Sequence, residues 1–283
     1  MTDATRRSPH GEAGDIRFTE LVVDGRDVRI EHAWVGDADA AAPLIVFLHE
    51  GLGSLAMWKD FPRTLCAAAR ARGLVFSREG YGRSTPRAPD ERWPVEFMHR
   101  QAHAVLPALL AQLGIVEPPW LFGHSDGASI ALLYAAEFPE RVAGVIAVAP
   151  HIFVEDLSVA SIADARTAYE TTDLRARLAR YHDDPDSAFR GWNDVWLDPA
   201  FRGWTIEDRL AGIRCPLLAV QGEDDEYGTM AQVEGIARRV PQARVVQLAA
   251  CGHSPQRDQP AALTGAVVAF LRQHGAAPTG DSD

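Results

Sequence analysis

Short apolar runs that alternate with stretches of helical periodicity constrain the fold of this chain most strongly. Apolar runs of strand length lie at 43–50, 74–77, 120–124, 142–150, 215–222 and 243–250. Helical periodicity lies between or after them, at about 58–72, 95–113, 126–138 and 229–239, and a last helical stretch ends near 274. Strands that are apolar along their whole length are covered on both faces. The alternation therefore predicts an α/β fold with a mostly parallel sheet and helices on both faces.

Two more strand patterns precede this alternation. The runs 17–23 and 28–35 are separated by Asp24-Gly25, a dipeptide typical of tight hairpin turns. These two strands are expected to be antiparallel. Added to the six apolar runs, they predict a sheet of eight strands.

The pattern changes after the sixth predicted strand. From 151 to 213 there is no convincing strand, and polar helical segments carry many aromatic residues. We interpret this segment as a helical insertion over the C-terminal edge of the sheet. The predicted organisation is a disordered tail at 1–15, a core at 16–150 and 214–274, the insertion at 151–213, and a disordered tail at 275–283.

Charge and cysteine content argue against several classes of function. The 283 residues include 28 Lys and Arg against 39 Asp and Glu, a formal net charge of −11. No basic face for nucleic acid or anionic lipid is expected, and no apolar stretch approaches the length that spans a bilayer. The tail at 1–15 lacks the apolar segment of a secretory signal, and the three cysteines lack CxxC spacing. We expect a cytoplasmic protein, with homo-oligomer formation left open.

A glycine-rich motif at 123–127, Gly-His-Ser-Asp-Gly, directs attention to Ser125. The motif follows an apolar strand and opens a helix, and its two glycines permit a sharp turn that presents the serine hydroxyl above the sheet. The N-terminus of the following helix supplies free N–H groups where negative charge develops. Ser125 is therefore a candidate nucleophile.

A serine nucleophile needs a histidine base and a carboxylate that orients it. Acidic residues at 223–226 follow one predicted strand, and His253 follows the next. The order serine, acid, histidine is the one expected for this architecture. The acid is left open among Asp225, Asp224 and Glu223, with a solvated acidic loop as the alternative.

Five segments together resemble the α/β-hydrolase superfamily, and the resemblance covers about 17–274. They are HEGLGS at 49–54, REGYGRS at 78–84, GHSDG at 123–127, QGEDDEYG at 221–228 and CGHSP at 251–255. The resemblance implies cofactor-free hydrolysis of an ester-like bond beneath a helical cap. It also implies Ser125 as nucleophile, His253 as general base and then acid, and Asp225 as the orienting carboxylate. The oxyanion hole would be the backbone N–H groups of Gly51 and Asp126.

The chain departs from the family pattern at two acidic positions. Glu50 stands where the family commonly has glycine, and Asp126 stands where it commonly has an apolar or small residue. Two anions beside an oxyanion oppose catalysis unless they are paired, protonated or turned away, and Arg78 is a candidate partner. One hypothesis is that they position water or bind a polar or cationic substrate group. The alternative is that structural hydrogen bonds hold them.

Other polar and aromatic residues were weighed for the same site. The candidate substrate pocket comprises Glu50, Arg78, His151, Trp192 and Trp196. His124 is expected to point away from Ser125, and His49 to have a structural role. The segment HDDPD at 182–186 lacks metal-ligand spacing, so we expect a solvated loop and no metal or cofactor.

The predicted function is hydrolysis of a small carboxylic ester, lactone or thioester through an acyl-enzyme, as in carboxylesterases (EC 3.1.1). Carbon–carbon bond hydrolysis and acyl transfer use the same triad and remain alternatives. A protein that binds a small molecule on this fold without turnover is a third alternative.

Overall fold

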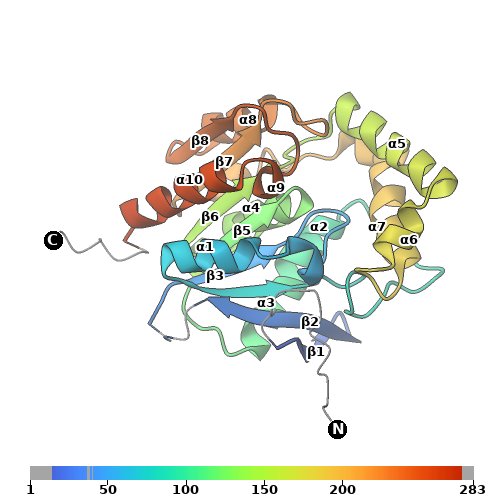
Figure 1. The fold of residues 1–283 in the computed structure, drawn as a ribbon, viewed down its shortest axis with the longest axis horizontal. Helices are drawn as coiled ribbons and strands as arrows, with labels where there is room; N and C mark the ends of the chain where they lie inside the picture. Colours follow the sequence, from blue (N-terminus) through green and yellow to red (C-terminus); the bar gives the residue numbers. More distant parts are fainter. Residues whose placement is uncertain (1–14, 37–38, 40, 276–283) are drawn as a thin grey trace, which may run out of the picture.

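A computed structural model describes residues 15–36, 39 and 41–275 (Figure 1). The predicted tails lie outside the described residues except at their inner ends. The strands are β1 (Arg17–Val23), β2 (Arg26–Gly36), β3 (Leu44–Leu48), β4 (Arg72–Phe76), β5 (Trp120–His124), β6 (Gly144–Val148), β7 (Leu217–Gly222) and β8 (Ala243–Leu248). They form one sheet in the order β1-β2-β4-β3-β5-β6-β7-β8, in which β2 is antiparallel to both of its neighbours, β1 and β4, and all other pairs are parallel. The predicted eight-stranded, mostly parallel sheet is confirmed.

The hairpin and the helices follow the sequence pattern closely. Asp24 and Gly25 both have positive φ, at 52° and 75°, as the predicted tight turn requires. The helices of the sheet region are α1 (Phe61–Ala69), α2 (Phe97–Arg100), α3 (Leu106–Gln112), α4 (Asp126–Glu137), α8 (Ala231–Arg239), α9 (Pro255–Asp258) and α10 (Pro260–Gln273). The predicted helix at 95–113 is α2 and α3 joined through a π-helical turn at Gln101–Val105.

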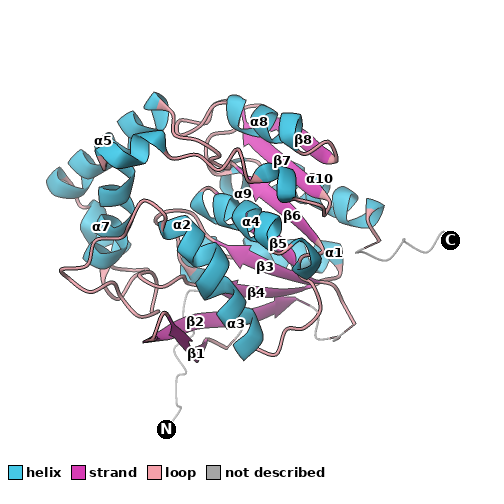
Figure 2. Cartoon of the chain, turned by 180° about the vertical axis from the view of Figure 1, so that it is seen from behind, coloured by secondary structure: helices cyan, strands magenta, loops and turns pink. Residues whose placement is uncertain are grey.

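The sheet has a separate apolar core on each face. Alternate residues of the central strands point to opposite sides, so Val46 and Leu48 join one core while Ile45 and Phe47 join the other. Residues of α3, α4 and α8 fill the first core, and residues of α1 and α10 fill the second. Figure 2 shows α3 and α4 in front of the sheet when it is seen from behind. Continuous apolar strands are thus buried on both sides, as their composition predicts.

The segment between β6 and β7 carries the helices α5 (Asp156–Thr171), α6 (Leu174–Leu178) and α7 (Pro185–Trp196). Figure 1 shows these three helices together at one end of the sheet. Their own aromatic contacts include Tyr169 stacked on Phe189, with ring centroids 3.8 Å apart. The packing explains part of the aromatic content of this segment.

The expectation of a solvated loop at 182–186 is wrong for His182. Its side chain is buried, its Nδ1 accepts the N–H of Gly82 at 2.9 Å, and its other ring nitrogen lies 3.1 Å from the Leu52 carbonyl oxygen. Asp184 caps the start of α7 by accepting the N–H of Ser187 at 2.8 Å. The histidine therefore ties the helical segment to the loops after β3 and β4. Sequence spacing cannot show contacts of this range.

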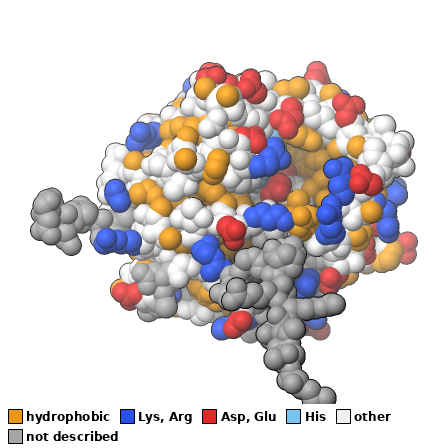
Figure 3. Space-filling model, in the orientation of Figure 1, with side chains coloured by type: hydrophobic (Ala, Val, Ile, Leu, Met, Phe, Trp, Pro, Cys, Tyr) orange, Lys and Arg blue, Asp and Glu red, His pale blue; other side chains and the backbone are white. Residues whose placement is uncertain are grey.

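The face of the molecule seen in Figure 3 carries charges of both signs. Figure 3 shows acidic and basic side chains interspersed with apolar ones across one face. None of the helices that the structure describes is long and apolar enough to cross a membrane.

Candidate active site

Ser125 lies in a strained turn between β5 and α4. Its backbone has φ 54° and ψ −122°, a conformation that residues other than glycine rarely adopt. The flanking glycines allow the close approach of strand and helix. A Cβ at Gly123 would lie 2.3 Å from the Gly127 carbonyl oxygen, and one at Gly127 would lie 2.1 Å from that of Leu48. This is the physical reason for glycine on both sides of the serine.

Three side chains from distant parts of the chain form one hydrogen-bonded series. Ser125 Oγ lies 2.9 Å from His253 Nε2. His253 Nδ1 lies 2.8 Å and 2.9 Å from the two carboxylate oxygens of Asp225. Because a carboxylate only accepts, Nδ1 carries the proton, and Nε2 is left to accept the hydroxyl hydrogen of the serine.

Among the three acids left open by the sequence, only Asp225 contacts the histidine ring. Its Oδ1 accepts the N–H of Tyr227 at 2.7 Å, and its Oδ2 accepts from the Gln221 amide at 2.6 Å. Asp224 and Glu223 are exposed. Burial works to raise the pKa of Asp225, but the hydrogen bond and charge of His253 outweigh it, so this pKa lies below its ordinary value. The carboxylate is held ionised and oriented.

Gly51 and Asp126, the residues predicted to form the oxyanion hole, line the same pocket as Ser125. Asp126 is the first residue of α4, so its N–H has no acceptor within the helix. Gly51 is buried against the indole of Trp192, and a Cβ there would lie 2.2 Å from Trp192 Nε1. Glycine at 51 thus lets the aromatic side chain close over the loop after β3.

A pocket opens onto Ser125 between the sheet and the helical segment. Of the predicted pocket residues, Glu50, His151, Trp192 and Trp196 line it and Arg78 does not. The full lining is Glu50, Gly51, Leu52, Ser125, Asp126, His151, Ile162, Trp192, Trp196, Tyr227 and His253. Sequence reasoning missed Leu52, Ile162 and Tyr227. Tyr227 could have been predicted, because it lies two residues after Asp225 in the same turn.

Arg78 is excluded from the pocket by its contacts. Its guanidinium donates Nη2–H to the Glu50 carbonyl oxygen at 2.8 Å and lies over the Tyr81 ring, with Cζ 4.6 Å from the centroid. Its backbone N–H donates to His49 Nε2 at 3.0 Å. The arginine therefore supports the loop after β3 from behind. The predicted pairing of Arg78 with the carboxylate of Glu50 is not found.

The two acids of the pocket differ in their surroundings. Burial works to raise the pKa of Glu50, but the hydrogen bond from His124 and nearby histidine charges outweigh it and lower this pKa to about 2. For Asp126, burial dominates and raises the pKa to about 6, although Arg78 and the hydrogen bond from Trp196 work against it. Trp196 Nε1–H donates to Asp126 Oδ1 at 3.2 Å. Asp126 is buried, whereas 26% of the Glu50 side chain is exposed.

Comparison with known proteins identifies the family. The model of the Alpha/beta hydrolase family matches residues 45–266, which is most of the chain. The chain belongs to the alpha/beta hydrolase family. It is 24% identical over 277 residues to a 2-hydroxy-6-oxo-6-phenylhexa-2,4-dienoate hydrolase from Comamonas testosteroni, which covers 88% of this chain and 93% of that protein.

Solved structures of the same fold superpose on this alpha/beta hydrolase along most of its length. A thermophilic esterase from Thermogutta terrifontis matches with a TM-score of 0.70 at 18% identity, covering 91% of this chain and 99% of the other. The enol-lactonase from Burkholderia xenovorans matches with a TM-score of 0.68 at 22% identity, covering 90% and 100%. At these identities the likeness confirms the fold class.

Three further histidines lie near the Ser125 site of the hydrolase. His151 is buried, with its ring 4.9 Å from that of Trp196 and 5.8 Å from that of His253, and burial lowers its pKa to about 3. His124 Nε2–H donates to the His253 carbonyl oxygen at 2.6 Å. His49 Nδ1–H donates to the Glu50 carbonyl oxygen at 2.7 Å. The latter two hold the backbone of the site, and His253 alone contacts Ser125 Oγ.

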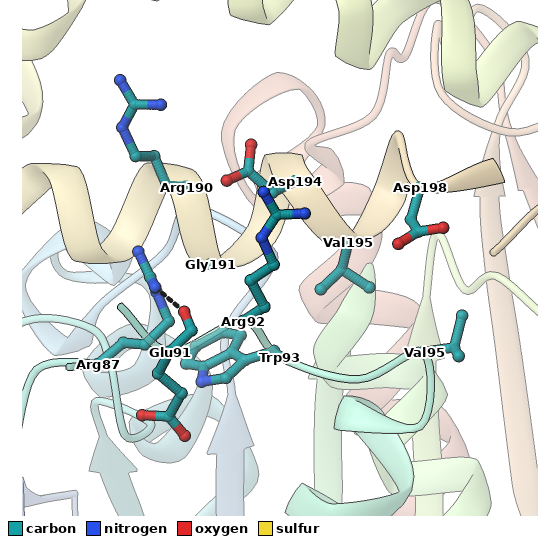
Figure 4. Close-up of a pocket in the computed structure, with 10 residues that line it drawn as sticks. All are labelled: Arg87, Glu91, Arg92, Trp93, Val95, Arg190, Gly191, Asp194, Val195 and Asp198. Atoms are coloured by element: carbon teal, nitrogen blue, oxygen red, sulfur yellow. Dashed lines mark hydrogen bonds between the residues drawn. The ribbon is translucent and has the colours of Figure 1, made fainter. Parts of the chain in front are cut away.

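A second hollow of the hydrolase lies between α7 and the loop before α2 (Figure 4). Arg87 donates to the Glu91 carbonyl oxygen there, while Asp194 pairs with Arg166 and the Glu91 carboxylate with Arg26. None of the lining residues belongs to the Ser125 series. Within the described part of the chain, no cluster of three or more His, Cys, Asp or Glu side chains is arranged to hold a metal ion.

Proposed function

We propose that this protein is a serine hydrolase that cleaves a small carboxylic ester, lactone or thioester through an acyl-enzyme. The observation that carries the proposal is the series Ser125–His253–Asp225, with its 2.9 Å and 2.8 Å contacts, at the floor of a pocket. A buried carboxylate fixes the imidazole tautomer, so that Nε2 takes the serine proton.

In the first half-reaction, Ser125 Oγ attacks the substrate carbonyl carbon as its proton passes to His253 Nε2. The negative charge on the carbonyl oxygen is stabilised by the N–H groups of Gly51 and Asp126. The tetrahedral intermediate collapses, the bond to the leaving group breaks, and His253 donates its proton to the departing oxygen or sulfur.

In the second half-reaction, water enters beside His253. Nε2 takes a proton from the water as its oxygen bonds to the acyl carbon, and the same two N–H groups stabilise the second oxyanion. His253 then returns the proton to Ser125 Oγ, the bond to the serine breaks, and the carboxylic acid leaves. Asp225 holds the imidazolium in place at both stages.

We assign the segment 151–213 as a cap over the core of 16–150 and 214–274. Support comes from Trp192 and Trp196, which line the pocket from α7, and from Ile162, which lines it from α5. Side chains of this kind restrict the size of the acyl group and exclude water from the acyl-enzyme.

The pocket lining favours esters over the carbon–carbon bond substrates named for several relatives. Those relatives hydrolyse dienoates, whose names denote carboxylates. The lining here contains Glu50 and Asp126 but neither Arg nor Lys. Two carboxylates repel a third in a site of low dielectric, so an anionic substrate is disfavoured.

We place the enzyme in the cytoplasm, acting on a small molecule without a cofactor. Its three cysteines are buried and free, which is consistent with a reducing compartment. The net charge of −11 opposes binding to nucleic acid, and homo-oligomer formation is left open.

The test is labelling with a fluorophosphonate, followed by intact mass spectrometry. We expect one label per chain in the wild type and none in Ser125→Ala, together with hydrolysis of p-nitrophenyl acetate by the wild type only. A variant at the half-buried Ser161, on α5, which does not line the pocket, serves as a serine control and should label normally. Equal labelling of Ser125→Ala and the wild type would contradict the proposal.

A further inference from the structure

Asp126 is a buried acid with an unused oxygen beside the nucleophile. It is 1% exposed and lines the pocket, and Trp196 donates to its Oδ1. Its Oδ2 is buried without a hydrogen-bond partner, and the residue takes part in none of the ion pairs found in the described chain. A buried carboxylate oxygen without a partner is costly, so its retention calls for a partner from outside the chain.

The remainder of the pocket suits a positive charge. Glu50 supplies a second carboxylate, and His151, whose pKa burial lowers to about 3, is neutral at physiological pH. Trp192, Trp196 and Tyr227 form aromatic walls, which attract cations through their ring faces. The charge of Arg78 lowers the pKa of Asp126, but its guanidinium donates to the Glu50 carbonyl oxygen, makes no hydrogen bond to Asp126 and does not line the pocket.

We propose that the pocket selects esters whose acyl group carries a protonated amine close to the scissile carbonyl, with Asp126 as the group that binds the ammonium. Amino-acid esters are the simplest members of this class. The inference rests on the proposed serine hydrolase activity and names its substrate class.

The placement on the acyl side follows from the position of Asp126. Its backbone N–H belongs to the proposed oxyanion hole, so its side chain branches from a residue that contacts the acyl carbonyl in both half-reactions. The leaving group, in contrast, departs after the first half-reaction. A carboxylate also rotates easily about χ2, so either oxygen can turn toward the ammonium while the other keeps the Trp196 hydrogen bond.

The experiment compares three esters of the same alcohol at pH 7: L-alanine benzyl ester, its analogue without the amine, propionic acid benzyl ester, and N-acetyl-L-alanine benzyl ester. Each kcat/KM is divided by the rate constant of the same ester with hydroxide, because an α-ammonium group activates the carbonyl by itself. We expect the corrected value for the alanine ester to exceed that for the propionate by about 10- to 100-fold, the range of a hydrogen bond between charged groups. The acetylated ester, which has no charge, should lose this advantage.

Asp126→Asn keeps the shape and the acceptor for Trp196 but removes the charge, and it should reduce the corrected ratio by about tenfold or more. Asp173→Asn, at a side chain that is 74% exposed and does not line the pocket, removes one charge and should leave the ratio unchanged. A ratio near one in the wild type would overturn the inference whether or not the variant folds, and so would an unchanged ratio in Asp126→Asn. Preference for 2-aminoethyl propionate, with the amine in the alcohol, over the alanine ester would overturn the acyl-side placement.

The amine preference and the serine hydrolase activity are contradicted by different results. If the propionate ester is hydrolysed and the corrected alanine-to-propionate ratio is near one, the amine preference is wrong and the proposed serine hydrolase activity is retained. Absence of any ester hydrolysis, together with absence of fluorophosphonate labelling at Ser125, removes the proposed function itself.

Discussion

Replacing Asp126 by asparagine should stabilise the unliganded protein more at pH 8 than at pH 5. Burial raises the pKa of Asp126 from 3.8 to about 6, so the folded state binds its proton more tightly than the unfolded state. This contribution to stability is complete below the unfolded pKa and is lost as the pH rises through the folded one. Because the pKa rises from 3.8 to about 6, ionisation of Asp126 lowers the free energy of unfolding by roughly 3 kcal/mol at pH 8 and by about half as much at pH 5.

The neutral asparagine avoids this loss, and any penalty for its amide is the same at both pH values. The free energy of unfolding of the variant should therefore exceed that of the wild type by about 1 to 2 kcal/mol more at pH 8 than at pH 5, or by a few °C in melting temperature for a domain of this size. Differential scanning fluorimetry at the two pH values measures it, with the exposed Asp173→Asn as a control that should show no such difference. A gain that is equal at both pH values, or larger at pH 5, would show that Asp126 is not destabilised by ionisation in the folded protein.

Four further outcomes follow from the site. Asp225→Asn should reduce kcat/KM for p-nitrophenyl acetate by about a thousandfold or more, because the amide no longer fixes the imidazole tautomer, and a loss under tenfold would contradict its role. Gly51→Ala should displace the Trp192 ring, since its Cβ would lie 2.2 Å from Nε1, and should therefore lower kcat and change the tryptophan fluorescence. Kinetics equal to those of the wild type would contradict this prediction. Trp192→Ala should raise the kcat/KM of p-nitrophenyl octanoate relative to the acetate by enlarging the pocket, and an unchanged chain-length profile would count against a wall at this position. The alanine-to-propionate preference should rise from pH 5 to pH 7 as the Asp126 carboxylate ionises near pH 6 among Arg78, His253 and Glu50, and a preference that falls over this range would be inconsistent with binding by a carboxylate.

The parts of the account that were predictable from sequence depend on strand ends. In a parallel sheet the loops after the strands meet at one edge, so Ser125, the acidic turn after β7 and His253 were expected together before any coordinates. Glycines at 123 and 127 marked the close approach of strand and helix. Local spacing alone left the acid open, and the contact of Asp225 with the imidazole depends on a turn geometry that the spacing does not determine.

Contacts between distant segments account for what was missed. The guanidinium of Arg78 turns behind the loop after β3 because the Glu50 carbonyl and Tyr81 hold it there. His182 is buried by the docking of the helical segment on two core loops. Ile162 reaches the pocket only through the placement of α5. Each of these depends on how the helical segment and the loops pack in three dimensions, which hydrophobic periodicity does not encode.

Trapping of the acyl-enzyme tests directly whether Ser125 is the nucleophile. Acid quench of the wild type during turnover of p-nitrophenyl acetate, followed by peptide mass spectrometry, should find one acetyl group on Ser125, formed in a burst of p-nitrophenol equal to the enzyme concentration. Acetyl bound elsewhere, or steady turnover with Ser125 unmodified and an active Ser125→Ala variant, would contradict the account.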